Sequence, residues 1–242
     1  MTLDARRLIE TGPHISVGLL AADLLRLGDE LGRLGEAGIN LVHVDVMDGR
    51  FCPQLTLGPA IVRAIPDRFV KDVHLMVDDP LPSAHAYVEA GASILTFHVE
   101  ATRHPHRMLQ SLADTGVIRG VAINPGTPLA AVEPLLGEAE LLLVLAVNPG
   151  WSGQTFISGT AERLRAARAL LGDRDVILAV DGGITRANVG DLQPLGVDLV
   201  VAGSAVFDGG DATANARSML EALRHGQGAV HPAAHAATGR RT

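Results

Sequence analysis

Cysteine, lysine and aromatic residues are scarce in this 242-residue sequence, and each shortage narrows what the protein can be. A single cysteine, Cys52, excludes an internal disulfide and is typical of a reducing compartment, so we expect a cytoplasmic protein. No apolar run approaches the roughly 20 residues of a membrane-spanning helix, and the first residues lack the apolar core of a signal peptide. We therefore expect no membrane partner.

Positive charge is scarce as well. The formal net charge is −7, and the sequence contains no basic block, which argues against a nucleic-acid partner. An anionic ligand must then be recognised by groups close to it, because the protein as a whole does not attract it.

Aliphatic rather than aromatic residues supply most of the hydrophobic content of the sequence. Hydrophobic residues are 47% of the sequence and aromatics only 3%, a composition typical of a buried parallel sheet covered by helices. Short apolar runs alternate with longer amphipathic stretches, such as 22–37, 81–90, 105–115 and 161–171. The expected strands are 14–20, 39–46, 69–76, 93–98, 117–123, 141–147, 176–180 and 198–202. Eight such strand–helix units in about 240 residues predict a single (β/α)8 TIM barrel in the α/β class.

The last residues do not fit this pattern. From Gly226 the sequence is rich in Gly, Ala, His and Pro and has no periodicity. We expect one barrel domain over residues 1–225 and a disordered tail over 226–242. The tail histidines His231 and His235 are expected to have no part in the chemistry.

Polar side chains stand at the ends of three expected strands. His43 and Asp45 are two residues apart, so they point to one face of their strand, and His74 and Asp181 end two others. Barrel sites are built at these carboxyl ends. Each histidine alone could be a core residue bonded to backbone. The four together predict a site for one divalent metal ion, Zn, Fe, Mn or Co, with carboxylates available for acid/base work.

Glycines cluster in the segments that follow the last three expected strands. Glycine lets backbone N–H groups approach an anion closely, and barrels often bind phosphate after strands 7 and 8. Each motif alone could be a tight turn. Their occurrence in three consecutive segments favours a phosphate site. The residues concerned are Gly150, Trp151, Ser152, Gly153, Gly182, Gly183, Gly203 and Ser204. Met47 and Met76 could be core filler or an apolar wall over a reacting carbon.

The motifs that contain these residues resemble the ribulose-phosphate 3-epimerase family from about His14 to Leu223. They are HVDVMDGRFCPQLTLGP (43–59), DVHLMV (72–77), FHVEA (97–101), NPGTP (124–128), VNPGWSGQ (147–154), VDGGI (180–184) and VAGSAVF (201–207). The resemblance implies a TIM barrel that interconverts D-ribulose 5-phosphate and D-xylulose 5-phosphate. It also implies that His43, Asp45, His74 and Asp181 bind the metal. Asp45 and Asp181 would be the two acid/base residues, with Asp45 the base in the ribulose direction. We also expect a homo-oligomer.

Some positions depart from the family pattern. Gly18 stands where the family usually has a substrate-contacting serine, Leu145 replaces a usual methionine, and Ala146 replaces the threonine that follows it. Trp151-Ser152 replaces a usual Phe-Gly. The metal and acid/base set is intact, so these departures affect the choice of sugar rather than the reaction class.

Three other functions compete with this hypothesis. The first is epimerisation of a tetrulose or hexulose phosphate. The second is a phosphosugar aldolase or decarboxylase on the same barrel. A Schiff-base aldolase needs a lysine at a strand's carboxyl end, and the only lysine, Lys71, is at the start of its strand. The third is a phosphometabolite-binding barrel without activity, which would be expected to have lost a ligand or carboxylate.

Overall fold

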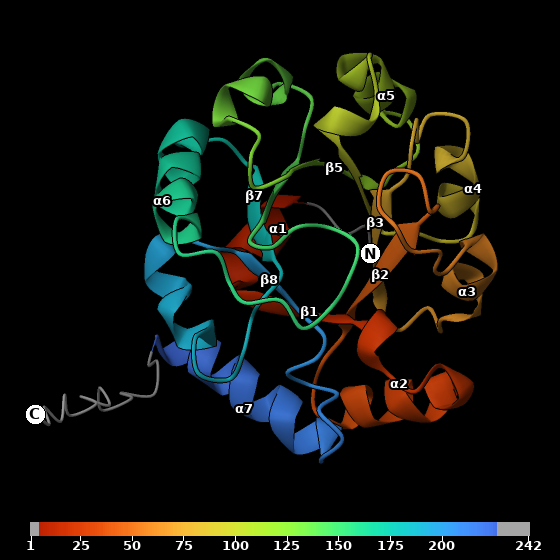
Figure 1. Ribbon diagram of the computed structural model, residues 1–242, viewed down its shortest axis with the longest axis vertical. Helices are drawn as coiled ribbons and strands as arrows, with labels where there is room; N and C mark the ends of the chain where they lie inside the picture. The colour runs from red at the N-terminus through yellow and green to blue at the C-terminus, as the bar shows by residue number, and fades with distance from the viewer. Residues whose placement is uncertain (1–4, 227–242) are drawn as a thin grey trace, which may run out of the picture.

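The computed structural model describes residues 5–226, which form a closed barrel of eight parallel strands in sequence order. Figure 1 looks along the barrel, with the helices arranged around it. The strands are β1 (His14–Gly18), β2 (Leu41–Met47), β3 (Val70–Met76), β4 (Ile94–His98), β5 (Ile118–Ile123), β6 (Leu141–Leu145), β7 (Ile177–Asp181) and β8 (Leu199–Ala202). The predicted TIM barrel is confirmed, and the predicted strand bounds differ from the observed ones by a residue or two.

The helices lie outside the strands, except for one at the end of the barrel. They are α1 (Ala5–Thr11), α2 (Leu27–Glu36), α3 (Pro59–Ala64), α4 (Ala84–Glu89), α5 (Pro105–Ser111), α6 (Thr160–Leu171) and α7 (Ala212–His225). Short 3-10 helices are η1 (Leu19–Ala21), η2 (Leu24–Arg26), η3 (Val99–Ala101), η4 (Leu129–Ala131), η5 (Glu133–Leu135), η6 (Val189–Asp191) and η7 (Gln193–Leu195).

The expectation of eight regular strand–helix units is wrong in two places. The connections after β5 and β7 contain only 3-10 turns. Pro134 and Pro194 lie within these turns, and proline interrupts an α-helix because it lacks an N–H and clashes with the preceding turn. Gly137 and Gly196 follow, and Gly196 adopts the left-handed conformation that ends a helix.

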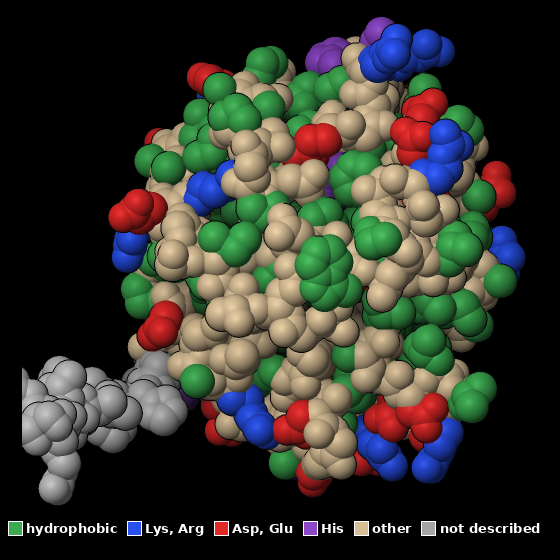
Figure 2. Space-filling model, viewed as in Figure 1, with side chains coloured by type: hydrophobic (Ala, Val, Ile, Leu, Met, Phe, Trp, Pro, Cys, Tyr) green, Lys and Arg blue, Asp and Glu red, His purple; other side chains and the backbone are tan. Residues whose placement is uncertain are grey.

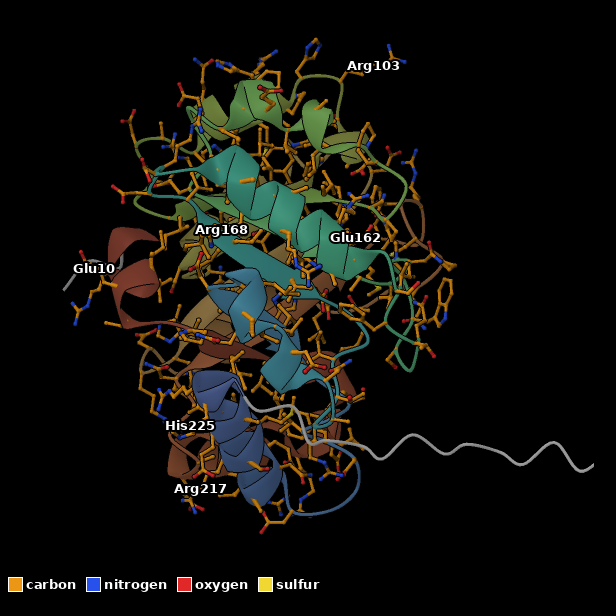
Figure 3. All side chains as sticks on the ribbon, turned by 90° about the vertical axis from the view of Figure 1, so that its left-hand side faces the viewer. Glu10, Arg103, Glu162, Arg168, Arg217 and His225 are labelled. Carbon is orange, nitrogen blue, oxygen red and sulfur yellow. The ribbon has the colours of Figure 1, made fainter. Side chains whose placement is uncertain are left out.

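Strand alternation divides the side chains into two cores. Outward side chains such as Val44, Val144 and Val180 are fully buried under the helices. Inward side chains near the start of the strands, such as Leu41 and Ile177, form a separate apolar cluster inside the barrel. Leu8 of α1 belongs to this inner cluster, so α1 closes that end of the barrel (Figure 3, at Glu10). The inner core therefore leaves the opposite end of the barrel open, at the carboxyl ends of the strands.

The described chain ends at Gly226, which directly follows the last residue of α7 and has a φ of +62°. Apart from this glycine, the predicted tail at 226–242 lies outside the described residues, and so do His231 and His235. The predicted domain boundary at residue 225 therefore stays a prediction. Over residues 5–226, the helices are all too short or too polar to cross a membrane.

Candidate active site

Four polar side chains predicted from the sequence converge at the carboxyl end of the barrel. His43, Asp45, His74 and Asp181 each offer one ligand-type atom, and these atoms all lie within 4.8 Å of one another. Asp45 Oδ1 lies 3.2 Å from His43 Nε2 and 3.4 Å from His74 Nδ1. His74 Nδ1 lies 3.8 Å from Asp181 Oδ2. Asp45 therefore occupies the centre of the group.

The strand register explains why these residues meet. In the β2–β3 pair, His43 is opposite Asp72 and Asp45 is opposite His74. Residues that are opposite each other and point inward have neighbouring side chains. Asp181 is the last residue of β7, so its carboxylate reaches the same level from across the barrel.

Three buried atoms at the centre of the group have no hydrogen-bond partner among the described residues: His43 Nε2, Asp45 Oδ1 and His74 Nδ1. A buried polar atom without a partner destabilises the fold by about 1–3 kcal/mol. A cation bound between them would satisfy all three atoms. Two imidazole nitrogens and two carboxylates form a donor set that suits a divalent transition ion. The residues present therefore fit such an ion.

The two carboxylates hold protons with unequal affinity. Burial alone would raise the pKa of Asp45, but His43 and His74 hold it well below its ordinary range. Burial, reinforced by the negative charge of Asp45, raises the pKa of Asp181 to about 7. At neutral pH Asp45 is therefore ionised, whereas Asp181 is close to half protonated.

The outer nitrogen of His43 is bound by a carboxylate that the sequence analysis did not assign. Asp72 Oδ2 lies 2.7 Å from His43 Nδ1 and accepts a 2.9 Å hydrogen bond from Ser16 Oγ. Burial alone would lower the pKa of His43, but Asp72 and Asp45 raise it well above its ordinary value, so positive charge is favoured here. The signal was present, because Asp72 is two residues before His74 and so shares its face.

A cavity lies above this group. On the face seen in Figure 2, charged side chains of both signs are scattered along the edge. Asp45 and Asp181 line it, whereas His43 and His74 are buried below. All the residues predicted to contact substrate line it too. They are Gly18, Met47, Met76, Gly150, Trp151, Ser152, Gly153, Gly182, Gly183, Gly203 and Ser204.

The segment between β6 and α6 crosses the mouth of the barrel (Figure 1). The side chain of Gln154, which the sequence analysis did not single out, links the two ends of a loop within this segment. Gln154 donates to Asn148 O at 2.6 Å and accepts from Asn148 N at 3.2 Å. Trp151, within this closed loop, is 48% exposed at the rim. Gln154 ends the motif at 147–154, but nothing in its spacing indicates that it ties the loop.

The described residues that line the cavity include no Lys and no Arg. Lys71 is the second residue of β3, where it pairs with Asp67 at 3.1 Å, at the opposite end of the barrel. A phosphate in the cavity would therefore depend on backbone N–H groups and on uncharged polar side chains such as those of Ser152 and Ser204.

Solved structures similar to this chain have the same fold. A 3-hexulose-6-phosphate synthase from Salmonella typhimurium has a TM-score of 0.65 and 22% sequence identity, over 88% of this chain and 100% of that one. A 3-keto-L-gulonate-6-phosphate decarboxylase from Vibrio cholerae has a TM-score of 0.68 and 14% identity, over 90% of this chain and 100% of that one. At these identities the likeness concerns the barrel alone.

Sequence comparison is more specific. The chain is 44% identical over 215 residues to a ribulose-phosphate 3-epimerase of Rhodobacter capsulatus, covering 88% of this chain and 91% of that protein. It is 39% identical over 199 residues to the ribulose-phosphate 3-epimerase of Escherichia coli (strain K12), covering 80% and 88%. Residues 14–207 match the profile described as the ribulose-phosphate 3 epimerase family. The chain therefore belongs to this family of isomerases and is an epimerase.

Proposed function

We propose that this epimerase interconverts D-ribulose 5-phosphate and D-xylulose 5-phosphate, with one of Asp45 and Asp181 removing the C3 proton from one face and the other donating its own proton to the opposite face. One observation carries the proposal: two carboxylates of unequal proton affinity, from β2 and β7, meet at the floor of one cavity. Two relatives that are 39% and 44% identical carry the name of this epimerase, which supports the choice of substrate.

The chemistry of inversion accounts for the pair. The C2 ketone acidifies the C3 proton, and inversion removes that proton from one face and returns one to the other. In the ribulose direction, Asp45 takes the proton and Asp181 donates one from the opposite side. Because β8 and β1 separate β7 from β2 around the barrel, the two carboxylates can address opposite faces of a sugar held between them.

His43, Asp45, His74 and Asp181 would hold one divalent ion, Zn, Fe, Mn or Co. An ion held there would supply positive charge, which would stabilise the negative oxygens of the enediolate that is left when C3 loses its proton. Met47 and Met76, both buried, form an apolar wall beside the acid/base pair that limits water at the reacting carbon. The phosphate is held by backbone N–H groups of the glycine segments after β6, β7 and β8.

An assay in deuterated water tests the reaction. With D-ribulose 5-phosphate we expect the xylulose epimer to form with deuterium at C3. Tetrulose and hexulose phosphates, assayed in parallel, decide the sugar. Aldol cleavage of the sugar without inversion would contradict the proposed reaction class.

Metal binding gives a second test that does not depend on turnover. Ligand that binds only the folded state, present at 100 times its Kd, stabilises the protein by about 2.7 kcal/mol. For a chain of this size we expect Co²⁺, added to metal-free protein, to raise the Tm by roughly 5–10 °C with one ion bound per chain. His43→Gln should lose most of this shift. An equal shift in the variant would place the ion elsewhere.

A tetrulose or hexulose phosphate remains a candidate substrate because residues around the cavity depart from the family pattern. Gly18 is the clearest case. A Cβ at this position would lie 3.4 Å from Gly203 Cα, an ordinary contact, so a serine fits. One added hydrogen bond contributes about 1 kcal/mol, so Gly18→Ser should raise kcat/KM for D-ribulose 5-phosphate several-fold. An unchanged value, with the pentulose far the best substrate, would show that the departures are neutral.

We also propose a homo-oligomer in the cytoplasm. Leu25 is 97% exposed and Leu55 is 79% exposed, and an interface that covered them would remove apolar surface from water. The single cysteine supports a reducing compartment. Light scattering of the purified chain measures the size of the assembly.

A further inference from the structure

The Nε2 atom of His74 points away from the proposed metal site. It contacts His98, a residue that has no part in the mechanism above. His74 Nε2 lies 2.9 Å from Nε2 of His98, the last residue of β4. Both rings are fully buried, with their planes 26° apart and their centroids 5.0 Å apart. Phe51 covers His98 on another side, at 4.7 Å between ring centroids. Two nitrogens at this distance share one proton, so one ring must donate and the other must accept.

The direction of this hydrogen bond follows from the other nitrogen of each ring. His74 Nδ1 faces Asp45 and Asp181 and must keep its lone pair to bind a metal. A neutral His74 then carries its proton on Nε2 and donates it to His98 Nε2. His98 in turn carries its proton on Nδ1, which lies 3.2 Å from Glu100 Oε2.

Glu100 is a fixed acceptor at the end of this chain of hydrogen bonds. Its Oε1 accepts from the backbone N–H of Asn124 at 2.8 Å and from the hydroxyl of Thr127. Arg163 of α6 donates to Asn124 O at 3.0 Å and to Thr127 O at 2.6 Å, which secures the segment after β5. The carboxylate of Glu100 thus accepts hydrogen bonds from Asn124, Thr127 and His98. As an acceptor it fixes the proton of His98 on Nδ1, and His98 Nε2 is then free to accept the proton of His74 Nε2.

The two histidines of the proposed metal site are thus supported differently. His43 has a carboxylate, Asp72, directly on its outer nitrogen, whereas a second imidazole stands between His74 and its carboxylate. Partners of this kind fix the tautomer and orientation of a ligand histidine, and their loss typically weakens metal binding by 10- to 100-fold.

We propose that His98 and Glu100 are positioning residues, which hold His74 in the tautomer whose Nδ1 lone pair faces the metal. This role rests on the metal site of the proposed function. Neither residue lines the cavity, so neither touches the substrate.

Glu100→Gln tests the direction of the chain without changing its shape. The amide of Gln would present an N–H₂ either to the N–H of Asn124 or to His98 Nδ1. In the second case His98 takes its proton on Nε2, and His74 is driven to the tautomer with its proton on Nδ1. Ring-nitrogen NMR of metal-free protein should show Nε2–H for His74 in the wild type and a shift toward Nδ1–H in the variant. The Kd for Co²⁺ should rise by about 10- to 100-fold.

A pair of substitutions at His98 separates positioning from packing. In His98→Gln, an amide can present its oxygen to His74 and its nitrogen to Glu100, so Co²⁺ affinity should stay within a few-fold of wild type. His98→Leu fills the space without an acceptor and should weaken binding as Glu100→Gln does. Glu138→Gln, which alters a partly exposed carboxylate paired with Arg119, should change nothing. The Tm of each variant reports whether it folds.

The outcomes are distinct. Wild-type Co²⁺ affinity in folded Glu100→Gln and His98→Leu, or Nδ1–H on His74 in the metal-free wild type, would overturn the positioning role alone. Failure of the wild type itself to bind Co²⁺ would overturn the proposed metal site together with this role.

Discussion

Asp45→Asn and Asp181→Asn are each expected to lower the rate of epimerisation by about 10²- to 10⁴-fold, the usual contribution of a positioned acid or base. Asparagine keeps the size of the side chain and removes its capacity to carry a proton. Both carboxyl groups line the cavity and are not part of the buried apolar core. The substitutions therefore leave the core packing unchanged, and the fold should survive. Measuring kcat at saturating Co²⁺ separates the loss of proton transfer from weaker metal binding.

The two variants should differ in the half-reaction that survives. If Asp45 is the base for the ribulose epimer, Asp45→Asn still has Asp181 to remove the C3 proton of the xylulose epimer. We therefore expect Asp45→Asn to exchange that proton of D-xylulose 5-phosphate with deuterated water, and Asp181→Asn to exchange that of D-ribulose 5-phosphate. Neither should form the opposite epimer at an appreciable rate.

Asp78→Asn serves as the matched control for this pair. Asp78 lies just after β3 at the same end of the barrel, is 51% exposed and pairs with Arg50 at 3.0 Å. Surface ion pairs contribute little to stability, so the control should retain wild-type turnover. Near-normal turnover in either catalytic variant would refute the mechanism with two carboxylates.

The barrel could be predicted because its determinants are local. Each strand is a short apolar run, and alternation alone assigns His43 and Asp45 to one face. The closed order of strands then brings the carboxyl ends of β2, β3 and β7 to one mouth. The convergence of four side chains followed from these two facts, without knowledge of any distance.

Contacts between strands were harder to predict, because they depend on register. Asp72 contacts His43 only because β2 and β3 pair with these two residues opposite each other. A shift by one residue would reverse which side chains face inward. The sequence alone leaves His98 as either a cavity residue or a structural one, and its contact with His74 depends on ring orientations that spacing does not define. The 3-10 connections after β5 and β7 could have been predicted from Pro134 and Pro194.

Gly183→Ala is expected to have the second large effect, through the segments proposed to bind phosphate. Gly183 has a φ of +67°, a conformation that costs other residues about 1–2 kcal/mol. Its Cβ would lie 2.5 Å from the backbone nitrogen of Phe156. Because that neighbour is backbone, the segments after β6 and β7 must move apart. We expect unfolding free energy to fall by about 2–5 kcal/mol, measured by urea titration.

Separation of these segments should also disrupt phosphate binding. A hydrogen bond to a charged group contributes about 1.5–3 kcal/mol, so loss of two such bonds lowers kcat/KM by about 100-fold or more. No Lys or Arg is among the described lining residues, so no charged side chain of the cavity replaces those amides. The inhibition constant of inorganic phosphate should rise in parallel, which links the loss to the anion rather than to proton transfer.

Alanine substitutions at two further glycines separate the two causes of the Gly183→Ala effect, which are backbone strain and the clash of the added Cβ. Gly153 has a φ of +80° and open space where a Cβ would lie, so Gly153→Ala introduces backbone strain without a clash. Gly126 has open space and no positive φ, so Gly126→Ala should be neutral or stabilising by about 0.4–1 kcal/mol. If the contact between the segments after β6 and β7 shapes the phosphate site, only Gly183→Ala combines a large loss of phosphate affinity with a large loss of stability. A folded Gly183→Ala with the wild-type inhibition constant would place phosphate elsewhere, because the amides of Gly182 and Gly183 cannot stay in place when the backbone beside them is displaced.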